Sequence, residues 1–183
     1  MTIAELPDLS DLRVLGASTT EVWAGANDPV ARGLVAWAGR AIGDDRGAAV
    51  RAAYAACKLV VGVYSGGEQS GYIDAMLAAV KQWLDAPTRE NQELTMKALD
   101  VTRQSHAWQI NEYHAGMWIL EAIDHAGLAV WSHSELSIYI TPAPPRTCAA
   151  RATACVYRSL LTHGKSEADA CKAVVAAVAA ANG

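Results

Sequence analysis

Apolar residues recur at spacings of three and four positions along most of the chain, and alanine is abundant among them. This spacing gathers the apolar side chains on one face of an α-helix, and alanine has the strongest intrinsic preference for helix. Hydrophobic residues make up 52% of the 183 residues, which is enough for a sizeable core in one domain. The pattern therefore predicts a single all-α domain that spans residues 1–183.

Caps, prolines and glycines divide the chain into six to seven helices. Asp28 is expected to cap the first of them and Pro29 to open it, because proline lacks only an N–H that is unpaired at that position. Ser166 and Asp169 form the pattern of a capping box before the last helix. Residues 1–28 are expected to form a loosely structured N-terminal arm with a short helix or turn. The predicted helices span residues 29–42, 45–63, 70–84, 89–110, 112–131, 147–163 and 167–182.

One segment, residues 136–145, departs from the helical spacing. It alternates at first and is rich in β-branched residues, and prolines follow. Since the sequence contains no second strand-like segment, it is predicted to form an extended strap across the helices. Aromatic and β-branched residues exposed on such a strap could bind a protein partner; alternatively, they clamp the strap onto the bundle. The predicted partner-binding residues are Trp131, Ile138, Tyr139 and Ile140.

The charge balance narrows the class of partner. A net charge of −4 and a pI near 5.7 argue against nucleic acid and against an anionic membrane surface, both of which favour a basic patch. No apolar segment approaches the ~20 residues that a bilayer-spanning helix needs, and the N-terminus lacks the features of a secretory signal. The chain is therefore expected to be cytoplasmic. Its four cysteines show neither CxxC nor zinc-ligand spacing, so buried free thiols are predicted.

The predicted helix at residues 112–131 carries polar side chains on one face. Two imidazoles with nearby carboxylates could bind a metal ion or share a proton; alternatively, these groups bond to one another, to a neighbouring helix or to water. No second helix carries a matching set of acids, so no metal site and no cofactor are assigned. The members of this face, with Asp124 beside it, are His114, Trp118, Glu121 and His125.

Lys58 lies in the second half of the predicted helix 45–63, which is apolar nearly all round. If Lys58 is buried there, its charge requires an acidic partner, and Glu121 or Asp124 is the expected one. Lys58 is therefore grouped with the polar face as a candidate ligand site or polar core.

Motifs of nucleophilic and phosphate chemistry lack their context. There is no Gly-x-Ser-x-Gly, and the Gly164-Lys165-Ser166 triplet lacks both the first glycine and the preceding strand of a Walker A loop. The cysteines stand mostly in apolar helical surroundings, which raise thiol pKa values and keep thiols inert. No catalytic residue is assigned, and a non-enzymatic function is favoured.

Residues 75–103 combine an Ala-rich helix, the turn Trp83-Leu84-Asp85-Ala86-Pro87 and a second amphipathic helix. This arrangement is similar to the helical immunity proteins of bacterial polymorphic-toxin systems. The resemblance implies a small, acidic, all-helical protein that binds and neutralises a cognate toxin, and it assigns no functional residues.

Three functional hypotheses follow. The leading one is a non-catalytic cytoplasmic binding protein of the immunity kind, with a protein partner. The second is a metal- or small-molecule-binding protein, or an enzyme, with a polar site on the helix at residues 112–131. The third is an oligomerisation module, because an Ala-rich helix such as residues 167–182 allows close approach between subunits.

Overall fold

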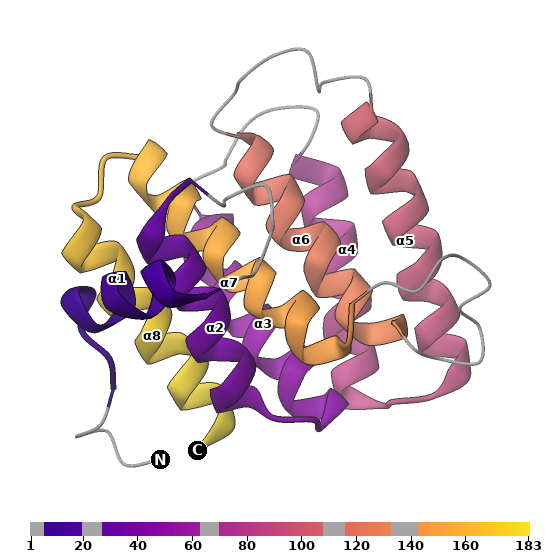
Figure 1. Cartoon of the computed structure of the whole chain (residues 1–183). Coiled ribbons are helices and arrows are strands. Elements are labelled where there is room, and N and C mark those ends of the chain that lie inside the picture. Colours follow the sequence, from indigo (N-terminus) through magenta and orange to yellow (C-terminus); the bar gives the residue numbers. More distant parts are fainter. Residues whose placement is uncertain (1–5, 20–26, 63–69, 108–115, 133–142) are drawn as a thin grey trace.

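The computed structural model describes residues 6–19, 27–62, 70–107, 116–132 and 143–183, which form eight helices (Figure 1). None of these residues lies in a strand, so the all-α class is confirmed. Six to seven helices were expected, and the additional one is α1, which forms in the N-terminal arm where a short helix or turn was expected. The helices are α1 (Leu9–Ser18), α2 (Pro29–Ile42), α3 (Arg46–Val61), α4 (Ser70–Asp85), α5 (Arg89–Ala107), α6 (Gly116–Trp131), α7 (Pro145–Thr162) and α8 (Glu167–Asn182).

The predicted caps stand where the sequence places them. Asp28 Oδ1 accepts hydrogen bonds from the backbone N–H groups of Val30 (2.9 Å) and Ala31 (3.2 Å), and Pro29 is the first residue of α2. Ser166 Oγ accepts from the Asp169 backbone N–H at 3.1 Å and begins α8.

The segment predicted as a strap, residues 136–145, differs from the structure at its C-terminal end. α7 begins at Pro145, so this residue is helical rather than extended. Proline is well suited to this first helical position. Ala143 and Pro144 precede this helix and lie in no regular element, while residues 136–142 of the predicted strap lie outside the described part of the chain.

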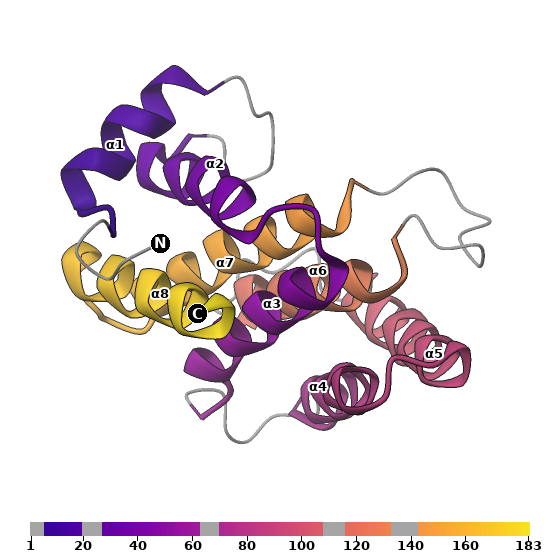
Figure 2. The same ribbon diagram turned by 90° about the horizontal axis from the view of Figure 1, so that it is seen from below.

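α7 lies at the centre of the bundle and is buried along most of its length. α2, α3, α6 and α8 all pack against it. The α1–α2 pair and the α4–α5 hairpin lie on opposite sides of the bundle, with α3, α6 and α7 between them (Figure 2). Among the described helices, none combines the length and the hydropathy that crossing a membrane requires.

α1 crosses α2 with their backbones in contact. A Cβ atom on Gly16 would overlap the Pro29 carbonyl, and a Cβ atom on Gly33 would overlap the Leu12 carbonyl. The Leu12 side chain is fully buried in the core. α1 is therefore anchored to the bundle through two glycines that no larger residue could replace without a shift of the helix.

Large side chains fill the gaps between Ala-lined helices. Trp37, Trp83 and Trp131 are buried in the core, whereas Trp118 is half-buried. The largest fully buried side chains are Tyr157, Leu12, Leu34, Met76, Leu99, Ile119, Ile123 and Leu160.

Candidate functional site

Trp118, Glu121 and His125 of the polar face predicted on residues 112–131 lie on α6, and Trp118 contacts α7. Asp124, beside this face, reaches α5 and accepts from Arg103 through two bonds: Nε to Oδ1 at 2.8 Å and Nη2 to Oδ2 at 3.2 Å. This two-pronged geometry is the strong form of an ion pair. It raises the pKa of Arg103 and ties α5 to α6. His114 lies outside the described residues.

His125 is the most buried polar member of this face, with 8% of its surface exposed. Burial disfavours the charged imidazolium and lowers the pKa of His125 to about 4. The nearby charges act in both directions, because Asp124 raises this pKa whereas Arg151 and Arg103 lower it. The imidazole is therefore neutral near pH 7, and its 4.0 Å approach to Glu121 Oε2 is not a salt bridge at that pH.

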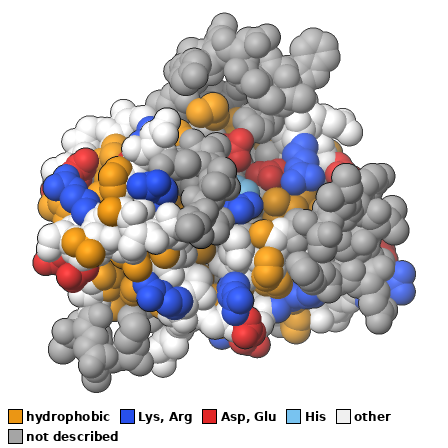
Figure 3. All heavy atoms as spheres, viewed as in Figure 1, with side chains coloured by type: hydrophobic (Ala, Val, Ile, Leu, Met, Phe, Trp, Pro, Cys, Tyr) orange, Lys and Arg blue, Asp and Glu red, His pale blue; other side chains and the backbone are white. Residues whose placement is uncertain are grey.

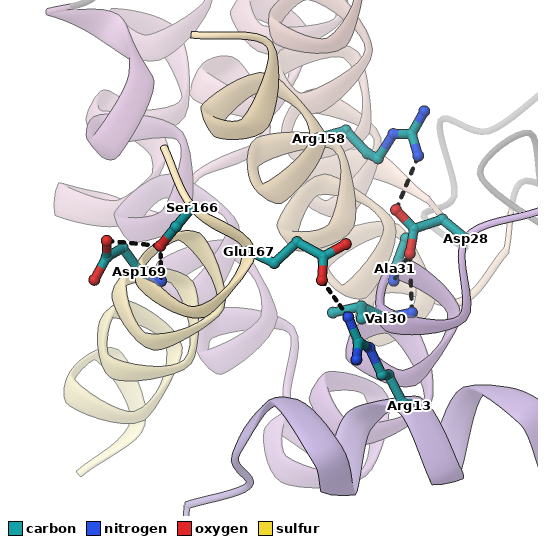
Figure 4. Close-up of polar contacts among 8 residues, drawn as sticks. All are labelled: Arg13, Asp28, Val30, Ala31, Arg158, Ser166, Glu167 and Asp169. Carbon is teal, nitrogen blue, oxygen red and sulfur yellow. Dashed lines mark hydrogen bonds and ion pairs between the residues drawn. The ribbon is translucent and has the colours of Figure 1, made fainter. Parts of the chain in front are cut away.

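Trp118 lies one turn before Glu121 on α6 and contacts Arg158 of α7. The Arg158 guanidinium stacks over the indole ring, 4.9 Å from its centroid. Arg158 Nη1 also donates to Asp28 Oδ2 at 2.8 Å, in the contact drawn in Figure 4. Because Asp28 caps α2 with its other oxygen, this carboxylate joins the start of α2 to α7.

Lys58 is exposed, so the condition under which it was expected to pair with Glu121 or Asp124 is not met. Asp124 pairs with Arg103. α3 is buried on most sides but keeps a solvent-facing stripe that holds Arg51 and Lys58, seven residues apart. A helix whose sequence is mostly apolar can therefore still expose two charged side chains to solvent.

Of the four residues predicted to bind a partner, the structure describes only Trp131. Trp131 is 4% exposed and packs in the core, so it does not present a binding surface. Ile138, Tyr139 and Ile140 lie outside the described residues. Their assignment to a partner-binding strap stays a prediction.

All four cysteines are free and buried, as predicted. Burial raises the pKa of the Cys57 thiol to about 12 and those of Cys148 and Cys171 to about 11. It raises that of Cys155 well above the ordinary value. Within the described residues, no group of three His, Cys, Asp or Glu side chains has the geometry to hold a metal ion.

A groove with a volume of about 720 Å³ lies between α1 and α8. No local pattern in the sequence predicts this groove. Its wall is mostly apolar, and charged side chains stand among the apolar ones. Figure 3 shows apolar and basic side chains interspersed on the side of the molecule where these helices lie. The groove is lined by Leu6, Pro7, Asp8, Leu9, Ser10, Arg13, Ala168, Cys171, Lys172, Val175 and Ala176.

Both walls of this α1–α8 groove are held in place. The Arg13 guanidinium of α1 pairs with the Glu167 carboxylate of α8 (Figure 4). At the start of α1, Asp8 Oδ1 accepts from the Asp11 backbone N–H at 2.9 Å, while Asp11 Oδ2 accepts from the Asp8 backbone N–H at 3.1 Å. This reciprocal capping box fixes the entry to the helix.

A second, more polar pocket of about 370 Å³ lies between α2 and the start of α7. Arg40 and Arg146 line it together with Thr147 and small residues. Both guanidinium groups are engaged, since Arg146 pairs with Asp44 and Arg40 Nε donates to the Ala36 carbonyl at 3.2 Å.

Comparison with protein-family models, with curated proteins and with solved structures finds no match to this chain.

Proposed function

We propose that this protein is a non-catalytic binding protein that takes an apolar ligand into the α1–α8 groove. The observation that carries the proposal is the groove itself. Its volume of about 720 Å³ falls within the roughly 300–1,000 Å³ typical of small-molecule sites, which are mostly apolar with a few polar groups. Leu6, Leu9 and Val175 provide apolar wall, and Arg13 and Lys172 provide charge.

The chemistry of the wall favours binding over catalysis at this site. The Cys171 thiol has its pKa raised to about 11 by burial, so at neutral pH it is a protonated, weakly polar surface. The pKa of Asp8 is lowered, first by the hydrogen bond from the Asp11 backbone N–H and then by Ser10. Asp8 thus stays ionised and serves the helix cap.

The polar face of α6 fits a structural role in the same proposal. Asp124 is held by Arg103 of α5, and Trp118 is covered by Arg158 of α7. These contacts join three helices. The face is therefore proposed to hold the bundle together rather than to bind a ligand.

A neutral fluorescent probe such as N-phenyl-1-naphthylamine tests the proposal. The full-length protein is expected to enhance its fluorescence saturably when the probe is excited directly. Ala176→Trp, at an exposed position that lines the groove, is expected to block the site. Ala180→Trp, one turn further along α8 and outside the lining, is the matched control. Equal probe binding by both variants would place the site elsewhere.

We propose toxin binding as the second candidate function, because an apolar pair is exposed within the segment that resembles immunity proteins. Leu94 is 37% exposed and Val101 48% exposed. They lie seven residues apart, on one side of α5. Two exposed apolar side chains on an outer helix could pack against an apolar patch on a partner protein.

Co-expression tests this second candidate. Each gene that neighbours this one is expressed alone and together with the chain, and growth is measured. A neighbouring product that arrests growth, is neutralised by the chain and binds it in purified form would support toxin binding. The double variant Leu94→Glu, Val101→Glu is expected to lose rescue, whereas Gln104→Glu, exposed on the same helix, keeps it. Rescue by the double variant would exclude the α5 face.

A further inference from the structure

The charged groups of the α1–α8 groove differ in whether they are already engaged. Asp8 accepts from the Asp11 backbone N–H at 2.9 Å and from Ser10 Oγ at 2.8 Å. Arg13 is paired with Glu167. These contacts satisfy two of the three charged side chains that line the groove in the described part of the chain.

Lys172 is the third, and it differs from the other two. It is exposed, it lines the groove, and no ion pair or hydrogen bond joins its ammonium group to any side chain in the described part of the chain. Its neighbours along the wall are the apolar side chains of Ala168, Val175 and Ala176. A positive charge thus stands beside an apolar surface with no acid assigned to it.

We propose that the ligand of the α1–α8 groove is a single-chain amphiphile with a hydrocarbon tail and a carboxylate, such as a medium- or long-chain fatty acid. The tail lies against Leu6, Leu9 and Val175, and the carboxylate pairs with the Lys172 ammonium. This inference rests on the proposed binding function of the groove and names its ligand class. Charge complementarity selects a carboxylate head group. Asp8 is the only acid among the described residues of the lining, and because it is already engaged it offers little to a cationic head group.

Three ligands with twelve-carbon chains and different head groups distinguish the contribution of the head group to affinity from that of the tail. Laurate, dodecanol and dodecyltrimethylammonium are titrated into the full-length protein below their micelle concentrations, with displacement of the neutral probe as readout. Laurate is expected to bind about two- to fivefold more tightly than dodecanol, which is the range for one exposed ion pair. The ammonium compound is expected to bind most weakly. High salt is expected to reduce the preference for laurate.

Variants of Lys172 test the head-group contact directly. Lys172→Gln is expected to weaken laurate binding about two- to fivefold and to leave dodecanol binding unchanged. Lys172→Arg keeps the charge and is expected to keep the preference. Lys165→Gln removes an exposed lysine outside the groove and serves as the control. Thermal melts of the variants establish that each is folded.

The outcomes distinguish this inference from the proposed function. If dodecanol binds as tightly as laurate and Lys172→Gln changes neither, the carboxylate inference is overturned while apolar binding stands. If no tail binds and the neutral probe is not taken up, both fail. If laurate binds only after residues 1–5 are deleted, the occupant is this chain's own N-terminus and the inference is overturned. If the protein is a dimer that Ala176→Trp dissociates, the occupant is a second copy, with the same consequence.

Discussion

Gly16 of α1 and Gly33 of α2 face each other where the two helices cross. A Cβ atom on Gly16 would stand 2.9 Å from the Gly33 backbone nitrogen, closer than such atoms approach in proteins. The crossing also sets the position of α1, and α1 forms one wall of the α1–α8 groove. Substitutions of Gly16 or Gly33 are therefore expected to change both the stability of the protein and the binding of a ligand in the groove.

The first prediction concerns this crossing. Gly33→Ala is expected to lower the free energy of unfolding by about 1–3 kcal/mol, because its methyl group collides with the Leu12 carbonyl and forces α1 outward. Urea unfolding measures the change. Gly39→Ala in the same helix is the control, since a Cβ there meets nothing within 4 Å. It is expected to be neutral or to stabilise by about 0.5–1 kcal/mol.

The second prediction concerns the Arg103–Asp124 pair. Arg103→Gln leaves a carboxylate that is only 14% exposed without its cation and is expected to destabilise the protein by about 1–3 kcal/mol. Arg89→Gln removes an exposed pair with Glu93 on the same helix, where a loss of roughly 0.5 kcal/mol or less is expected. Equal effects of the two variants in urea unfolding would mean that the α5–α6 pair contributes no more than a surface contact.

The third prediction concerns acid stability. A histidine in the unfolded chain has a pKa of about 6.5, whereas burial lowers the pKa of His125 to about 4 in the folded state. Between these values the unfolded chain binds more protons, so stability falls as the pH drops from about 6.5 to about 4. The loss attributable to His125 is expected to reach roughly 3 kcal/mol.

His125→Gln isolates this contribution in a pH series of urea unfolding curves. The variant is expected to lose less stability than the wild type between about pH 7 and pH 4. His163→Gln, at the turn between α7 and α8, controls for the loss of a histidine as such. A steep acid loss that survives in His125→Gln would assign it to other groups.

The fourth prediction separates the two roles of Asp28. Asp28→Asn keeps an oxygen that can cap α2 but loses the charge that pairs with Arg158. Asp28→Ala loses both and is expected to be less stable than Asp28→Asn by about 1 kcal/mol. Addition of Arg158→Gln to each variant completes a double-mutant cycle. A cycle with no coupling between Asp28 and Arg158 would show that only the cap matters.

Local signals in the sequence were enough to predict several elements. Asp28 and Pro29 identified the start of α2, and the spacing of Trp118, Glu121 and His125 placed them on one face of α6. These features depend on residues within a few positions of one another. The all-helical class follows from the same local periodicity, repeated along the chain.

Contacts between distant segments could not be predicted in this way. Arg103 and Arg158 belong to other helices than the residues they meet, and nothing in a single sequence pairs them. The groove depends on how closely α1 approaches its neighbours, which Gly16 and Gly33 set together. The sequence suggests burial of Lys58 because its neighbours in sequence are mostly alanine and valine. Such a pattern does not reveal a narrow solvent-facing stripe.

The four buried cysteines make the unmodified protein its own reporter of local opening. A thiol reagent can reach Cys57 only in molecules whose surrounding helices have transiently separated, whereas it approaches Cys171 through the groove that this residue lines. Cys171 samples the wall between α1 and α8, whereas Cys57 samples α3. A ligand bound in the groove is then expected to slow the modification of Cys171 and to leave the modification rate of Cys57 unchanged.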